Sequence, residues 1–127
     1  MSPLPASRNL PLFTYGTLLD ETFTRRLLER AVESEAARLL DSELLQLEGL
    51  DYPTVFDAPG EAVEGRIYRD IAPRDWERLD AYEGVGEGLY RRIEARVVAG
   101  GAGKEGPSEP AFVYVVTEET LRRYGAL

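Results

Sequence analysis

The sequence predicts a mixed α+β fold with a curved sheet. Segments typical of strands outnumber helical segments, and the two kinds do not alternate strictly, as they would in a doubly wound sheet. The chain has 127 residues, which is the usual size of one domain and enough to bury one hydrophobic core. We therefore expect a loose N-terminal tail over residues 1–9 and a single domain over residues 10–127.

Strand signals recur along the whole chain as short apolar runs or as runs in which apolar and polar residues alternate. Gly16 ends the first run, and Pro59-Gly60 predicts a turn. In the run over residues 89–98, alternation places Ile93, Ala95 and Val97 on one face. The expected strands cover residues 10–15, 62–68, 89–98 and 111–116, with a short β-type run within 49–56 and two short strands over the ambiguous segment 35–49.

Three helices are indicated by residues that favour helix ends. Asp20 can cap a helix over residues 21–32, since its side chain can accept hydrogen bonds from the first free N–H groups. Pro73 suits the first turn of a second helix, and Gly84 suits the position just beyond its end. Thr117 can cap a short C-terminal helix.

The composition excludes several kinds of chemistry. The chain contains neither Cys nor His, which excludes a Cys nucleophile, a His general base, a disulfide framework and Cys/His zinc sites. Lys104 is its one lysine, and no calcium-loop or other metal-ligand spacing occurs. Any catalysis must therefore use carboxylates, hydroxyls, arginine or backbone groups, and we expect neither metal nor cofactor.

Charge and the N-terminal sequence bear on partners and location. The net charge is −8, and short arginine pairs do not form the basic stripe that nucleic-acid or anionic-membrane binding requires. The N-terminus lacks the basic and apolar stretches of a signal peptide, and no apolar run approaches the ~20 residues of a membrane span. We expect a cytoplasmic protein, monomeric or weakly dimeric, that binds neither nucleic acid nor membrane.

A glycine-rich motif near the C-terminus is better interpreted as a loop. Residues 101–106 match G-x-G-x-x-G, the fingerprint of dinucleotide-binding sites. That site requires the glycines to open a helix, but Pro107 and Pro110 follow directly. Residues 99–110 therefore predict a flexible loop.

The turn formed by Tyr15, Gly16, Thr17 and Leu18 is the first candidate for a functional site. It follows a strand and precedes a capped helix, where successive N–H groups can converge on an anion or oxyanion. Gly16 permits a positive φ and close approach of a ligand to the backbone. The alternative is an ordinary connection between a strand and a helix.

Glu83 is the second candidate. On a helix, Trp76, Leu79 and Glu83 share one face, so the carboxylate is expected to be partly desolvated. It also occupies the last turn, where the helix dipole disfavours negative charge. Both effects raise a carboxyl pKa, as a general base requires in a protein without His. The alternative is a Glu83 that bends to solvent or pairs with Arg91 or Arg92.

Four motifs in order together resemble the γ-glutamylcyclotransferase-like family, in its γ-glutamylamine cyclotransferase or AIG2-like branch. The resemblance extends from about residue 10 to residue 116. The motifs are Phe13-Thr-Tyr15-Gly16-Thr17-Leu18-Leu19-Asp20, Asp51-Tyr52-Pro53-Thr-Val-Phe56, Val63-Glu-Gly65-Arg-Ile-Tyr68, and Leu79-Asp80-Ala-Tyr82-Glu83-Gly84 followed by Tyr90-Arg-Arg92.

The resemblance implies a small mixed β-barrel with helices and an enzyme that releases 5-oxoproline and an amine from a γ-glutamyl compound. It implies Glu83 as the acid/base, residues 15–18 as the loop that holds the glutamyl group, and Tyr90 as a pocket residue. The segment between Glu83 and Tyr90 is longer than is common in the family, which admits Glu87 as a rival. Two alternatives are a non-catalytic small-molecule-binding or regulatory protein on the same fold, and an enzyme dedicated to one pathway metabolite.

Overall fold

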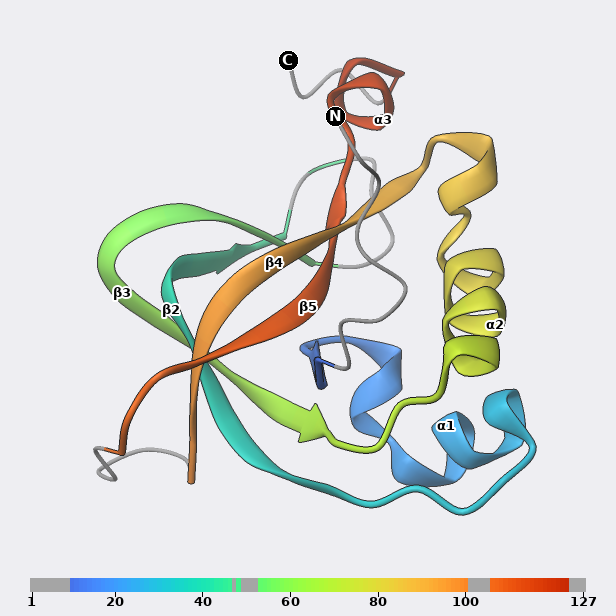
Figure 1. Cartoon of the computed structure of the whole chain (residues 1–127). Helices are drawn as coiled ribbons and strands as arrows, with labels where there is room; N and C mark the ends of the chain where they lie inside the picture. Colours follow the sequence, from blue (N-terminus) through green and yellow to red (C-terminus); the bar gives the residue numbers. More distant parts are fainter. Residues whose placement is uncertain (1–9, 47, 49–52, 101–105, 124–127) are drawn as a thin grey trace.

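The computed structural model describes residues 10–46, 48, 53–100 and 106–123, and shows a closed five-stranded barrel with helices packed beside it (Figure 1). The strand order is β1-β3-β2-β4-β5, with one parallel pair, β1 and β5, among antiparallel neighbours. This is the mixed β-barrel with short helices that the sequence predicts. The strands are β1 (Leu12–Thr14), β2 (Ser34–Leu45), β3 (Thr54–Tyr68), β4 (Tyr90–Ala99) and β5 (Glu109–Val116); the helices are α1 (Glu21–Leu28), α2 (Pro73–Glu83) and α3 (Glu118–Arg123), with 3-10 turns η1 (Thr17–Leu19) and η2 (Val85–Glu87).

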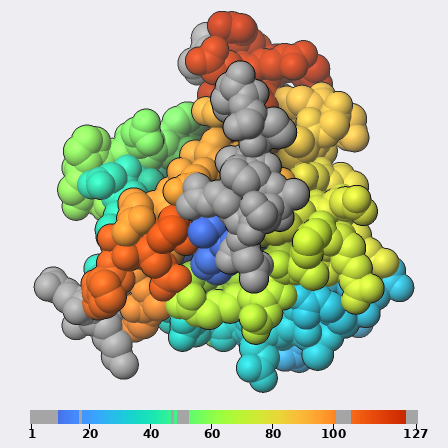
Figure 2. All heavy atoms as spheres, in the orientation of Figure 1, coloured from blue at the N-terminus to red at the C-terminus, as the bar shows by residue number. Residues whose placement is uncertain are grey.

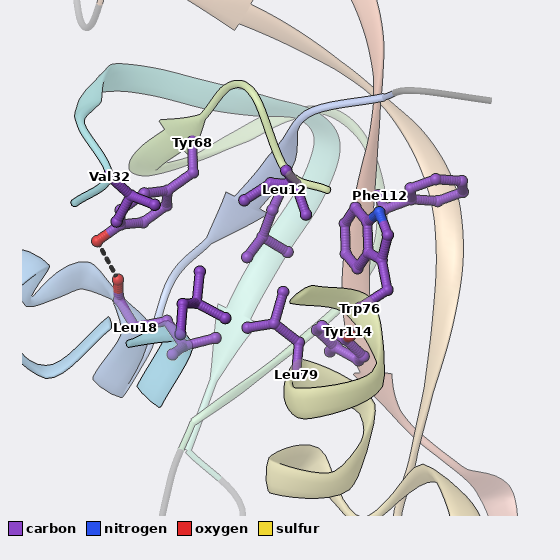
Figure 3. Close-up of a cluster of buried hydrophobic side chains, with 10 residues drawn as sticks. Leu12, Leu18, Val32, Tyr68, Trp76, Leu79, Phe112 and Tyr114 are labelled. Atoms are coloured by element: carbon purple, nitrogen blue, oxygen red, sulfur yellow. Dashed lines mark hydrogen bonds between the residues drawn. The ribbon is translucent and has the colours of Figure 1, made fainter. Parts of the chain in front are cut away.

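Alternation along the strands divides the apolar side chains between two clusters. On β1, Phe13 points into the barrel, whereas Leu12 packs toward the helices. On β5, Val113 and Phe112 divide in the same way. The barrel cluster contains Phe13, Ala37, Leu39, Val55, Val63, Ile67, Val97, Ala111, Val113 and Val115. The cluster between barrel and helices contains Leu12, Leu18, Leu28, Val32, Tyr68, Ile71, Trp76, Leu79, Phe112 and Tyr114 (Figure 3).

Helices α1 and α2 lie next to each other on one side of the barrel, where they form one continuous surface (Figure 2). The rings of Phe23 on α1 and Tyr82 on α2 lie 5.2 Å apart, in a tilted arrangement. The residues predicted to mark the ends of these helices, Asp20, Pro73 and Gly84, lie at those ends. Asp20 accepts hydrogen bonds from two N–H groups of the first turn of α1, and α2 begins at Pro73 and ends before Gly84, which has a φ of 72°.

Helix α1 is shorter than the predicted 21–32. It ends at Leu28 because Glu29 adopts the left-handed conformation, with a φ of 55°, and its N–H group bonds to the carbonyl of Arg25. Val32 is still buried in the core, but it reaches the core from the loop that follows the helix.

The predictions for β2 and β3 were wrong in two places. The expected pair of short strands over 35–49 is one strand ending at Leu45, and Pro59-Gly60 lies inside β3 instead of reversing the chain. The pairing register shifts beside these residues, where Asp41 and Gly60 both have positive φ. The N–H group of Gly60 donates to Asp41 Oδ1 at 3.0 Å, which stabilises the irregularity as a bulge.

The other expected elements are found. Ile93, Ala95 and Val97 share the barrel face of β4, and Thr117 Oγ1 accepts from the N–H group of Thr120 at the start of α3. The tail over 1–9, the glycines of 101–105 and Tyr52 lie outside the described residues. No helix in the described ranges has the length and apolar character needed to cross a bilayer, and no acidic cluster within them is arranged to hold a metal ion.

Candidate active site

A pocket of about 240 Å³ opens where the end of β1 meets the C-terminal end of α2 and the start of β4. It brings together five of the six candidate residues, Tyr15, Gly16, Leu18, Glu83 and Tyr90. The sixth, Thr17, lies between Gly16 and Leu18 in η1, and its side chain lies outside the described part. The lining residues are Phe13, Thr14, Tyr15, Gly16, Leu18, Pro53, Tyr82, Glu83, Leu89, Tyr90 and Tyr114.

The turn over residues 15–18 is held in place through its own carbonyl groups. The Leu18 carbonyl accepts a hydrogen bond from the Tyr68 phenol at 2.7 Å (Figure 3). It accepts a second one from Thr24 Oγ1 at 3.1 Å. Within the turn, the N–H group of Leu19 donates to the Gly16 carbonyl at 2.9 Å. Tyr68 and Thr24 are fully buried, so the turn rests on two fixed donors from β3 and α1.

Gly16 does not use the backbone freedom that the sequence suggested. Its φ is not in the positive region, so the conformation of the turn makes no use of the positive φ that glycine permits. A Cβ atom at Gly16 would meet no atom within 4 Å, so the backbone here faces open space in the pocket. A small ligand can therefore approach the main chain closely.

Gly65, the glycine of the motif over residues 63–68, allows two strands to approach each other closely. A Cβ atom at this position of β3 would lie 2.2 Å from the Thr14 carbonyl oxygen and 2.5 Å from the Phe13 ring. Only glycine allows β3 to approach β1 this closely. Because Thr14 and Phe13 both line the pocket, this approach sets the position of one pocket wall.

Tyr15 joins the turn to β5. Its phenol donates a hydrogen bond to the Tyr114 carbonyl at 2.6 Å. Burial raises the pKa of this phenol well above its usual value, so Tyr15 remains a neutral donor at ordinary pH. Its hydroxyl is thus committed to holding the two walls together, while its ring lines the pocket.

Glu83 is the one charged side chain among the described lining residues. Burial raises its pKa to about 7, in the direction predicted from its helix position beside buried Trp76 and Leu79. Within the described ranges its carboxyl group has neither a hydrogen-bond partner nor an ion-pair partner. A half-buried carboxyl group with such a pKa can take up or release a proton near neutral pH.

The structure shows where the alternative residues and partners of this segment lie. Arg92 lies 3.7 Å from Asp80 instead of pairing with Glu83, and Arg91 is exposed. The rival carboxylate Glu87 is exposed in η2 and does not line the pocket.

Sequence reasoning missed Tyr114 and Asp80. The Tyr114 phenol lines the pocket and donates to Asp80 Oδ1 at 2.5 Å, which connects β5 to α2. Alternation along β5 places Tyr114 on the same face as Phe112, toward the helices, and could have indicated its orientation. The pairing with Asp80 spans 34 residues and has no local signal.

Comparison with known proteins agrees with this architecture. The family model described as gamma-glutamyl cyclotransferase, AIG2-like matches residues 12–126. AIG2-like protein D of Arabidopsis thaliana is 25% identical over 108 residues, which cover 85% of this chain and 69% of that protein. Protein AIG2 C of the same plant is 27% identical over 94 residues, 74% of this chain and 54% of its own length. The chain therefore spans only about half to two thirds of these relatives.

Solved structures show the same fold. A solution structure of an Arabidopsis thaliana protein superimposes with a TM-score of 0.74 at 23% identity, over 100% of this chain and 73% of that one. A structure described as gamma-glutamyl cyclotransferase gives a TM-score of 0.70 at 24% identity, over 85% of this chain and 66% of that one. At these identities the likeness concerns the fold, whereas the family match spans nearly the whole sequence. The chain belongs to the gamma-glutamyl cyclotransferase, AIG2-like family.

Proposed function

We propose that the protein is a cyclotransferase that releases 5-oxoproline and a free amine from a γ-glutamyl compound. The observation that carries the proposal is Glu83: a half-buried carboxyl group without a partner among the described residues, with a pKa raised to about 7, lining a small pocket together with the 15–18 turn. Membership of the family supports the reaction class. The proposed reaction needs neither a protein nucleophile nor a cofactor, which suits a chain without Cys or His.

In the proposed mechanism the substrate supplies its own nucleophile. Glu83 takes a proton from the α-ammonium group, and the freed amine attacks the γ-carbonyl carbon. The carbon–nitrogen bond to the leaving amine then breaks, and Glu83 returns its proton to that nitrogen. The ring nitrogen, which still carries two hydrogens after the attack, loses its second proton to solvent. A pKa near 7 suits both proton transfers, since the group must accept and then donate at similar pH. The products are the five-membered lactam and the free amine.

The remaining barrier is lowered by holding the glutamyl chain in its bent form. Intramolecular attack in a well-oriented conformer reaches effective molarities of ~10⁵–10⁸ M. The open backbone at Gly16 and the fixed position of the turn support binding of the glutamyl group by main-chain N–H groups. Such donors can also stabilise the developing oxyanion, each typically contributing about 3 kcal/mol.

The test is product formation. Purified protein is incubated with γ-glutamyl amides and γ-glutamyl amino acids, and 5-oxoproline is quantified by liquid chromatography and mass spectrometry. We expect product with the wild-type protein and a loss of about 10²–10⁴-fold in turnover with Glu83→Gln. Glu87→Gln is the matched control, because it makes the same change at an exposed carboxylate outside the pocket.

Three outcomes separate the alternatives. Turnover by Glu83→Gln at the wild-type rate contradicts the role of Glu83. Saturable binding of γ-glutamyl compounds without product identifies a binding protein on the same fold. Turnover of one compound alone within a broad panel identifies an enzyme dedicated to a single metabolite.

A further inference from the structure

A second carboxylate lies one helical turn before Glu83. Asp80 and Glu83 are three residues apart on α2, so they are neighbours on its surface. Unlike Glu83, Asp80 has two partners: the Tyr114 phenol donates to Oδ1 at 2.5 Å, and Arg92 Nη2 lies 3.7 Å from Oδ2. Asp80 is thus hydrogen-bonded and close to a cation, whereas Glu83 has no such partner among the described residues.

Arg92 is held in place by aromatic rings as well as by Asp80. Its guanidinium carbon lies 4.4 Å from the centre of the Trp76 ring and 5.0 Å from that of Phe112. Its side chain is 20% exposed, and its Nε atom is buried without a hydrogen-bond acceptor in the described structure. The guanidinium therefore keeps an unused donor close to the pocket.

Arg92 comes from the strand that also supplies Tyr90 to the pocket. It follows Tyr90 by two residues on β4 and so shares its face, and Tyr90 lines the pocket together with Glu83. An arginine within about 4–6 Å of a carboxyl group lowers its pKa by roughly 1–3 units. A direct ion pair would therefore remove the capacity of Glu83 to exchange protons near neutral pH.

We propose that Asp80 is a positioning residue of this pocket: it captures Arg92 and the Tyr114 phenol, and thereby leaves Glu83 unpaired. The consequence for catalysis rests on the proposed function of Glu83. The contacts of Asp80 with Arg92 and with the Tyr114 phenol do not depend on that function. Asp80 also fixes the Tyr114 wall, because the same carboxylate holds the phenol while Tyr15 holds the backbone carbonyl of that residue.

No other group near Glu83 supplies a competing charge among the residues that the structure describes. The titratable groups that line the pocket with it come from the β1 turn, α2, β4 and β5, and all are tyrosines, which are uncharged around neutral pH. They are Tyr15, Tyr82, Tyr90 and Tyr114. The ion pair of Asp80 with Arg92 is the charged pair that lies beside this group of tyrosines, since Asp80 also accepts from the Tyr114 phenol; Glu87 is exposed to solvent.

The test follows the Glu83 carboxyl group directly, without substrate. In protein labelled with ¹³C in its glutamate carboxyl groups, the Glu83 resonance is assigned by its loss in Glu83→Gln and titrated between about pH 4 and 9. We expect Asp80→Asn to lower the pKa of Glu83 by about one unit, because Arg92 is released toward it while the asparagine still accepts from Tyr114. Adding Arg92→Met to this variant restores the wild-type titration. Glu77→Gln, the same change at an exposed position of α2, leaves it unchanged.

Two results overturn the inference: an unchanged titration in Asp80→Asn, or an equal fall in the double variant, which indicates a general opening of the pocket. Arg92→Met alone gives an independent check if Asp80→Asn fails to fold. It keeps the Asp80 charge and removes the cation, so the pKa of Glu83 rises; a fall contradicts the proposal.

Turnover separates this inference from the proposed function. If no γ-glutamyl compound is converted, the proposed function fails, but the titrations still decide the role of Asp80. If 5-oxoproline forms and Asp80→Asn leaves the acidic limb of kcat/KM at the wild-type pH, the role of Asp80 fails alone. The expected result is a shift of that limb to lower pH by about one unit, matching the titration.

Discussion

The two ends of α2 carry acidic residues in opposite electrostatic states. Asp75, in the first turn, has a side chain that is only 1% exposed; its Oδ2 atom has several donors, whereas its Oδ1 atom is buried without one among the described residues. Arg30 contacts Asp75 Oδ2 through Nε at 3.0 Å and through Nη2 at 2.6 Å, and the N–H group of Ala72 donates to the same oxygen at 2.8 Å. Burial favours a higher pKa, but these donors outweigh it and hold the pKa of Asp75 below its usual value.

Glu83, the last residue of the same helix, has no such donor in the part of the chain that the structure describes. Burial is the cause that raises its pKa to about 7. The N-terminal end of a helix offers free N–H groups and a positive dipole end to a carboxylate, whereas the C-terminal end offers neither. Burial therefore produces a structural anchor at one end of α2 and a proton-exchanging group at the other, depending on the partners that each end provides.

The largest effect is expected from breaking the anchored end. Asp75→Ala removes the ion pair with Arg30 and the hydrogen bond to Ala72, and should lower the free energy of unfolding by about 3 kcal/mol at pH 7. The folded pKa of Asp75 is depressed, so its contribution exists above the unfolded pKa and is lost as the pH falls. Urea denaturation should show the difference from wild type shrinking toward about pH 3. Glu77→Ala is the exposed control on the same helix; an equal loss there contradicts the comparison.

The unpartnered end should show the opposite sign. Glu83→Gln is expected to increase the free energy of unfolding by about 2 kcal/mol at pH 8, because the fold no longer buries an unpaired charge. The folded pKa is raised above the unfolded value, so the wild type is fully stable below the unfolded pKa and loses stability as the pH rises through about 7. The advantage of the variant should therefore vanish by about pH 4 to 5. A variant less stable than wild type at pH 8 contradicts the absence of a partner for Glu83.

The smallest effect is expected from the 15–18 turn, which lines the pocket together with Glu83. Like Asp75, this turn is held by hydrogen bonds, which the Leu18 carbonyl accepts. Tyr68→Phe removes the phenol that donates to the Leu18 carbonyl and leaves Thr24 as the donor. We expect a loss of about 1 kcal/mol in the free energy of unfolding, with a raised KM for γ-glutamyl substrates because the turn is less firmly held. Denaturation and steady-state kinetics measure the two effects, and unchanged KM would show that the turn keeps its position without Tyr68.

The parts of the fold that could be predicted have local causes. Pro73 and Gly84 mark the ends of α2 through their own backbone preferences, and the position of Glu83 beside Trp76 and Leu79 follows from helical periodicity. The raised pKa of Glu83 was therefore predictable. The periodicity of the sequence predicts only a curved sheet. The prediction of a closed barrel came from the resemblance of four motifs to one family.

The errors arose where a local signal was outweighed by tertiary pairing. Pro59-Gly60 is a turn signal, but pairing of β3 with β2 continues on both sides of it, and Asp41 accommodates it as a bulge. Likewise, the hydrogen bond between Tyr114 and Asp80 depends on how β5 packs against α2. No local pattern in the sequence predicts that these two residues meet.

The hydrogen bond between the Tyr15 phenol and the Tyr114 carbonyl joins residues that are 99 positions apart. On a ribosome that adds about 5–20 residues per second, Tyr114 is made roughly 5 to 20 seconds after Tyr15. Throughout that interval the turn over 15–18 has no opposite wall, and Glu83 has no pocket to face. The pocket therefore cannot assemble before β5 has been made, and fragments that stop before β5 should be unable to form the site.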